Sequence, residues 1–112
     1  MCVSAMPRAN RVLRRWRVCV NGEPEDVVGV SNRLKDIDRE RFGIRFCVWQ
    51  IERAPTTGRL HVQAYFEFTR GVKCTHVYVV CGQHVDCRSC DASTQANIDY
   101  VTKEDTREEG PF

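Results

Sequence analysis

The sequence predicts one α+β domain built on an antiparallel sheet, and three observations point to this class. Residues 59–68 alternate apolar and polar side chains without a break, which is the pattern of a half-buried strand. Residues 44–52 are rich in Ile, Phe, Val and Trp, and only a turn over residues 54–58 separates the two segments, so they form a hairpin. Helical patterns on both sides of this hairpin give an α+β order in which helices flank the sheet.

A strand and a long helix are expected ahead of the hairpin. Alternation over residues 15–21 predicts a strand whose buried side begins at Trp16. Pro24 suits the first turn of the helix that we expect over residues 24–41, and Gly43 ends that helix.

After the hairpin the chain returns to helical and short strand-like patterns. Residues 72–81 are rich in β-branched side chains but stand where a helix would let the chain cross back, so both states remain open. Residues 84–88 predict a short strand. Residues 95–103 predict a helix, with acceptable N-cap side chains at positions 91, 93 and 94.

Composition and charge describe a globular chain with a basic start. Of its 112 residues, 42% are hydrophobic and 29% are charged, and the net charge is +2. Every charged residue up to position 17 is an arginine, so we expect a flexible basic arm over residues 1–12 that contacts a polyanion, followed by the folded domain over residues 13–112. No segment has the apolar length of a membrane span or of a signal peptide, so we expect an intracellular protein.

The seven cysteines raise the question of disulfides or zinc. An odd number, with two inside predicted strands at Cys19 and Cys47, favours reduced thiols. Six cysteine and histidine residues, the residue types that most often bind zinc, occur late in the chain: Cys74, His76, Cys81, His84, Cys87 and Cys90. They run through a predicted helix and a strand and point in several directions, but a zinc-stabilised interaction domain remains an alternative.

A candidate site for a divalent metal lies on the hairpin. His61 and Gln63 share one face of their strand, about 6–7 Å apart, and Glu52 ends the strand on the other side of the turn. An imidazole, an amide oxygen and a carboxylate form a mixed nitrogen–oxygen set that suits Mg²⁺ or Mn²⁺ better than a thiolate-rich zinc site. Such an ion would polarise a phosphate and neutralise charge in the transition state of its cleavage.

A candidate nucleophile lies near the end of the chain. Tyr100 and Lys103 are three residues apart in the last predicted helix and share one face of it. A phenol is a weak nucleophile at neutral pH, so a metal ion or a nearby cation has to assist it. Attack on a phosphodiester would leave a phosphotyrosine and a free hydroxyl, and the bond energy would be retained for rejoining.

These segments together resemble the replication-initiator (Rep) endonuclease domains, of the HUH class, that circular single-stranded DNA viruses encode. The circovirus, nanovirus and alphasatellite proteins are the most similar in pattern. Residues 15–21 resemble the first motif of the family, an aromatic-led strand that ends in asparagine. Residues 58–65 resemble the second, with Gln63 in place of the second histidine, and residues 99–106 resemble the third, with its single tyrosine. The resemblance covers residues 15–112.

The resemblance implies a central antiparallel sheet of about five strands and an enzyme that nicks and rejoins single-stranded DNA. Its substrate would be the stem-loop of a viral replication origin, and the reaction would initiate rolling-circle replication in the host cell nucleus. Tyr100 would be the nucleophile with Lys103 as a second catalytic group, and Glu52, His61 and Gln63 would bind Mg²⁺ or Mn²⁺. Further residues are expected to contact DNA: Arg14, Arg15, Trp16, Arg17 and Asn21.

The resemblance also sets expectations about what surrounds this domain. Relatives continue into an oligomerisation segment and a helicase, whereas this sequence has no G-x-x-x-x-G-K-[ST] loop. We therefore expect a nuclease domain that does not hydrolyse ATP, that belongs to a protein which oligomerises through a C-terminal region, and that has no membrane partner. The alternative function is a non-catalytic module that binds single-stranded nucleic acid on its sheet without a metal ion.

Overall fold

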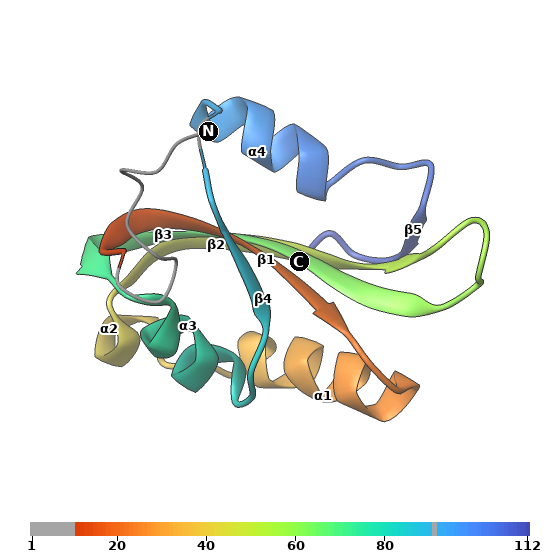
Figure 1. The fold of residues 1–112 in the computed structure, drawn as a ribbon, viewed down its shortest axis with the longest axis horizontal. Coiled ribbons are helices and arrows are strands. Elements are labelled where there is room, and N and C mark those ends of the chain that lie inside the picture. Colours follow the sequence, from red (N-terminus) through yellow and green to blue (C-terminus); the bar gives the residue numbers. More distant parts are fainter. Residues whose placement is uncertain (1–10, 91) are drawn as a thin grey trace, which may run out of the picture.

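A computed structural model describes residues 11–90 and 92–112 of the chain, which fold around one five-stranded sheet (Figure 1). The elements in chain order are β1 (Leu13–Asn21), α1 (Pro24–Lys35), α2 (Arg39–Phe42), β2 (Ile44–Arg53), β3 (Leu60–Val72), α3 (Cys74–Cys81), β4 (Asp86–Ser89), α4 (Thr94–Val101) and β5 (Arg107–Glu109). The strands are ordered β4-β1-β3-β2-β5, and every neighbouring pair is antiparallel. The predicted fold class, an α+β domain with a central antiparallel sheet and flanking helices, is confirmed.

One face of the sheet is apolar and is covered by α1, α2 and α3, which lie together on one side of it in Figure 1. Period-two alternation in the strands sends every second side chain into this layer. The buried strand residues on this face include Trp16, Val18 and Val20 of β1, Trp49 and Ile51 of β2, and Val62, Ala64, Phe66 and Phe68 of β3. The helices meet them with residues at helical spacing, such as Val27, Val30 and Leu34 of α1.

The opposite face carries a smaller apolar cluster under α4, the one helix of residues 11–90 and 92–112 that lies on that face (Figure 1). Val48, Tyr65 and Val101 form the buried centre of this cluster. The Tyr65 hydroxyl donates to Glu67 Oε2 at 2.6 Å, and the Thr94 hydroxyl at the start of α4 donates to the same oxygen at 2.8 Å. These bonds fix the start of α4 on the sheet, and the polar side chains of the same face gather beyond its other end.

One predicted helix is divided in the structure, and one segment whose state the sequence left open is helical. The helix expected over residues 24–41 is broken after Lys35, because the Asp38 side chain accepts a hydrogen bond from the Arg41 backbone N–H at 3.1 Å and so caps the separate short helix α2. In the segment 72–81, for which both helix and strand were possible, Val72 ends β3 and Cys74–Cys81 form the helix α3, whose buried residues recur every three to four positions.

The last strand is absent from the pattern-based prediction. β5 consists of Arg107, Glu108 and Glu109, and three charged residues carry no strand pattern of their own. It forms because the unpaired edge of β2 is available, with Glu52 opposite Arg107 and Ile51 opposite Glu109. The fifth strand was therefore expected only from the family resemblance.

Two parts of the sequence-based prediction concern residues that the structure does not describe. Most of the predicted basic arm, residues 1–10, lies outside them, and so does the N-cap candidate at position 91. Arg11 is described and donates to the Ser89 hydroxyl of β4 at 3.0 Å. Within the described residues, no helix has the length and apolar character that a membrane span requires.

A candidate metal and nucleophile site

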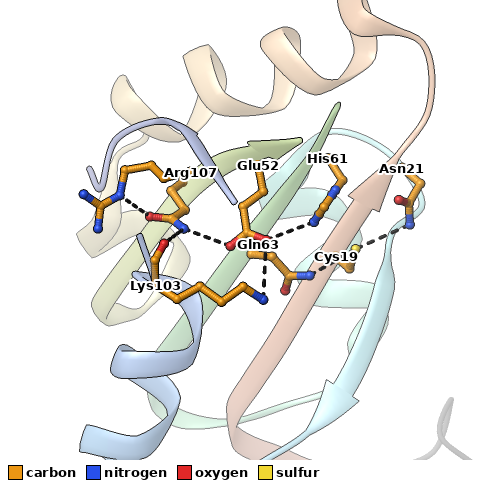
Figure 2. Close-up of polar contacts among 8 residues, drawn as sticks. Cys19, Asn21, Glu52, His61, Gln63, Lys103 and Arg107 are labelled. Atoms are coloured by element: carbon orange, nitrogen blue, oxygen red, sulfur yellow. Dashed lines mark hydrogen bonds and ion pairs between the residues drawn. The ribbon is translucent and has the colours of Figure 1, made fainter. Parts of the chain in front are cut away.

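Strand register brings the three predicted metal ligands together. Glu52 of β2 lies directly opposite His61 of β3, and Gln63 follows two residues later on the same face. On the other side of β3, Asn21 and Cys19 of β1 lie opposite His61 and Gln63. These polar side chains therefore occupy one patch on the sheet face that α4 only partly covers (Figure 2).

The Glu52 carboxylate is the centre of this patch, although only 1% of the residue is exposed. Its Oε1 atom lies 3.1 Å from His61 Nε2 and 3.7 Å from Lys103 Nζ. Its Oε2 atom accepts a hydrogen bond from the side-chain amide of Gln50 at 2.8 Å. A buried carboxylate needs such partners, since the loss of water is offset only by hydrogen bonds and opposite charge.

Tyr100 lies beside this patch with two cations against its ring. Lys103 Nζ is 4.4 Å from the ring centroid, and Arg17 Cζ is 4.5 Å from it. The helix α4 ends at Val101, so Lys103 follows the helix instead of belonging to it as predicted. The predicted proximity of Tyr100 and Lys103 is nevertheless present, and Lys103 contacts both the Tyr100 ring and the Glu52 carboxylate.

An open cleft of about 250 Å³ adjoins the ring of Tyr100. It is lined by Arg17, Val18, Cys19, Asn21, Gln63, Asp86, Arg88 and Tyr100. The cleft therefore connects the candidate nucleophile with one candidate metal ligand, and two guanidinium groups border it. Guanidinium groups in a cleft are suited to hold phosphate oxygens.

The donor atoms of the patch fit a magnesium or manganese ion. Glu52 Oε1 and His61 Nε2 are 3.1 Å apart, so one ion can be shared between them after a small adjustment. Gln63 uses its amide nitrogen to donate to Cys19 Sγ at 3.6 Å, which leaves its amide oxygen as the atom for a metal. One carboxylate oxygen, one imidazole nitrogen and one amide oxygen also leave coordination positions for water or a phosphate.

Cys19 lies in the cleft as a neutral thiol. Burial raises the pKa of this thiol, and the nearby carboxylates of Asp86 and Glu52 add to the shift. Its sulfur accepts hydrogen bonds from Gln63 and, at 3.4 Å, from Asn21. Cys19 therefore orients its neighbours in the cleft and is not a thiolate nucleophile.

The five predicted DNA contacts separate into different environments. Trp16 is fully buried, with its indole N–H donating to the Val72 carbonyl oxygen at 3.0 Å, so a direct DNA contact there was a wrong prediction. Arg15 donates to the Cys90 and Ala92 carbonyl oxygens and so ties the segment before α4 to β1.

The other three predicted contacts can reach a ligand. Arg17 and Asn21 line the cleft, and Arg14 is exposed near the start of β1. The alternation of β1 explains why Arg17 and Asn21 differ from Trp16, because odd-numbered positions from Arg15 onward face the polar side of the sheet.

The zinc alternative finds no support in the described part of the chain. There, no three His, Cys, Asp or Glu side chains are grouped so that they could hold a metal ion. Cys74, Cys81 and Cys87 are buried in the main core, and burial raises the pKa of Cys81 to about 12. His76 Nε2 lies 2.8 Å from the Phe42 carbonyl oxygen.

Several polar residues of the site were not predicted as site residues, among them Gln50, Arg88 and Arg107. Gln50 is on the same face of β2 as Glu52, so period-two alternation could have identified it. Arg88 lines the cleft from β4, where it lies opposite Arg17, and alternation could have found it once β4 was paired with β1. Arg107 had no such signal, because its position depends on the pairing of β5.

Comparison with known proteins adds no identification. No protein-family model matches the chain, and no curated protein matches it. The resemblance of the sequence motifs to those of viral replication initiators therefore stays a prediction.

Proposed function

We propose that this domain is a metal-dependent, site-specific DNA nickase and joining enzyme that acts on single-stranded DNA at a replication origin. The observation that carries the proposal is the position of Lys103. Its ammonium group contacts both the Glu52 carboxylate and the Tyr100 ring, and so links a metal-binding set to a nucleophile. A passive binding surface has no need of a buried carboxylate, an imidazole and a tyrosine arranged in this way.

The proposed reaction is a transesterification. The phenol oxygen of Tyr100 bonds to the phosphorus of a phosphodiester and loses its proton to water. The bond from phosphorus to the 3′ oxygen breaks, and this oxygen takes up a proton as a free 3′ hydroxyl. The 5′ phosphate stays on Tyr100, so an incoming 3′ hydroxyl can reverse the step and join the DNA.

The surrounding residues have separate roles in this proposal. Glu52, His61 and Gln63 would hold Mg²⁺ or Mn²⁺, which supplies charge neutralisation at the scissile phosphate. The ammonium of Lys103 adds positive charge next to the Tyr100 ring. Arg17 and Arg88 border the cleft where the bound strand would place its phosphates.

The wider role follows from the family that the motifs resemble. Nicking of an origin stem-loop would begin rolling-circle replication of a circular viral genome in the host nucleus. Joining would later release a circle from the covalent intermediate. A C-terminal region of a longer protein would provide oligomerisation.

A denaturing gel with an end-labelled oligonucleotide tests the proposal. The oligonucleotide carries a stem-loop with an origin-type nonanucleotide, and the reaction contains Mn²⁺ or EDTA. We expect a nick and a protein–DNA adduct with Mn²⁺ only, and no product from Tyr100→Phe. Tyr78→Phe, which changes a tyrosine on the opposite side of the sheet, should retain both products. Metal-independent binding without a nick across several origin sequences would favour the binding-module alternative.

A further inference from the structure

Two side chains, Gln50 and Arg107, form a hydrogen-bonded bridge between Glu52 and β5, the last strand of the domain. Gln50 is fully buried, and its amide nitrogen donates to Glu52 Oε2 and to the Lys103 carbonyl oxygen, each at 2.8 Å. Its amide oxygen accepts a hydrogen bond from Arg107 Nε at 3.0 Å. Arg107 also donates from Nη2 to the Thr102 carbonyl oxygen. Figure 2 draws the hydrogen bonds by which Arg107, the Lys103 carbonyl oxygen and the Glu52 carboxylate are linked.

We propose that Gln50 and Arg107 are positioning residues, which orient the Glu52 carboxylate toward the metal and fix the loop that carries Lys103. This inference rests on the proposed function and extends it. Gln50 occupies Oε2 of Glu52, so Oε1 is the oxygen directed to His61 and Lys103. A hydrogen-bond partner of a metal ligand fixes the orientation of that ligand and affects how tightly it binds the metal ion.

Only an amide side chain satisfies this position. The site presents two acceptors, the Glu52 carboxylate and the Lys103 carbonyl, and one donor, the Arg107 guanidinium. A glutamine supplies two N–H donors and one acceptor oxygen in a single planar group. A glutamate at position 50 would put two carboxylates together, and an apolar residue would leave all three partners without their bond.

The chain packs tightly around the bridge after β5. Gly110 has a φ of +105°, and a Cβ atom there would lie 3.0 Å from the Cβ and 3.2 Å from the Cα of Gln50. Glycine is therefore needed at this position, both for its backbone conformation and for the close approach. Phe112 then donates its backbone N–H to the Trp49 carbonyl oxygen at 2.8 Å and packs on the Trp49 ring with centroids 5.5 Å apart, so the segment after β5 follows the edge of β2 beside Gln50.

The test measures Mn²⁺ binding to the DNA-free protein, from the signal of unbound Mn²⁺ in electron paramagnetic resonance. We expect Gln50→Met and Arg107→Gln to weaken Mn²⁺ binding by about 10- to 100-fold. Nicking by both variants should fall at limiting Mn²⁺, and a higher Mn²⁺ concentration should restore part of it, because the bridge acts in part through the metal ligand and in part through the loop that carries Lys103. Glu108→Gln is the matched control, since it removes an exposed ion pair with Arg53 from the same strand.

Two further measurements keep the outcomes separate. Circular dichroism and thermal unfolding establish that each variant is folded, and Arg107→Gln, at the edge of the sheet, tests the bridge if Gln50→Met does not fold.

Glu52→Gln should lose Mn²⁺ binding, because it removes a proposed metal ligand. Folded Gln50→Met or Arg107→Gln protein that binds Mn²⁺ like wild type would overturn the inference and leave the proposed function intact. Wild-type protein that neither binds Mn²⁺ nor nicks DNA would overturn both.

Discussion

At the scale of single residues, the site depends on how each charge is compensated. Glu52 is buried, and its two oxygens have different partners: Gln50 on one, and His61 with Lys103 on the other. Tyr100 is at the surface, between Arg17 and Lys103. The carboxylate is therefore held by several partners, while the phenol that would attack a phosphate in the proposed reaction is accessible.

Lys103 gives a prediction that separates catalysis from metal binding. Lys103→Met removes a positive charge beside the Tyr100 ring, so we expect DNA nicking at saturating Mn²⁺ to slow by about a hundredfold. The same change removes a cation 3.7 Å from Glu52, so Mn²⁺ affinity should not fall. Single-turnover cleavage and Mn²⁺ titration measure the two quantities. Lys73→Met, on an exposed residue before α3, is the control, and nicking at the wild-type rate by Lys103→Met would refute this role.

At the scale of elements, α4 is the part that has to be held in place, because it carries Tyr100. Its first residue, Thr94, donates to Glu67, and Tyr65 donates to the same carboxylate. The hydrogen bond from Tyr65, with a second from Thr94, holds the pKa of Glu67 below its ordinary value near 4.5. A lowered pKa in the folded state means that the ionised carboxylate stabilises the fold.

The pH dependence of this contact follows from the sign of the shift. The stabilisation is complete above a pH of about 4.5 and disappears as the pH falls through the lower pKa of the folded state. Tyr65→Phe should therefore reduce the free energy of unfolding by about 1 kcal/mol at neutral pH, and by less in acid. Urea unfolding of both proteins at pH 7 and at about pH 3 measures the difference. An equal difference at both pH values would contradict the account.

Which elements the sequence predicts, and which it does not, has a physical explanation. Strict alternation over residues 59–68 identified the central strand, and the positions of His61 and Gln63 followed from it. The same alternation places Trp16 on the buried side of β1, so its assignment as a DNA contact disregarded the pattern. The bridge of Gln50 and Arg107 depends on β5, whose three residues pair only when the edge of β2 already exists.

At the scale of the whole molecule, the two faces of the sheet differ in polarity and in how much of each face the helices cover. The face under α1, α2 and α3 is apolar and provides most of the core. The face under α4 has a small apolar cluster at one end, and the polar site and its cleft at the other. The proposed DNA-binding surface is therefore the α4 side of the sheet, along β1 and β4.

The position of the proposed DNA-binding surface predicts which arginines contribute to the affinity for single-stranded DNA. Arg17→Ala and Arg88→Ala should each weaken binding of single-stranded DNA about 3- to 10-fold. Each should also reduce the slope of log affinity against log salt concentration, by about 0.7 for every phosphate contact that is lost. Arg41→Ala, on the α2 side of the molecule, should leave both quantities unchanged. Fluorescence anisotropy at several salt concentrations, with EDTA present to prevent cleavage, measures both. An equally large effect of Arg41→Ala would place DNA elsewhere.

The most direct test of the central claim is to map the covalent adduct. The protein is incubated with the stem-loop oligonucleotide and Mn²⁺, digested with nuclease and protease, and the modified peptide is sequenced by mass spectrometry. The account predicts a nucleotide joined through a 5′ phosphate to Tyr100, and no adduct with Tyr100→Phe. An adduct on Tyr65 or Tyr78, or DNA cleavage without any adduct, would contradict the account.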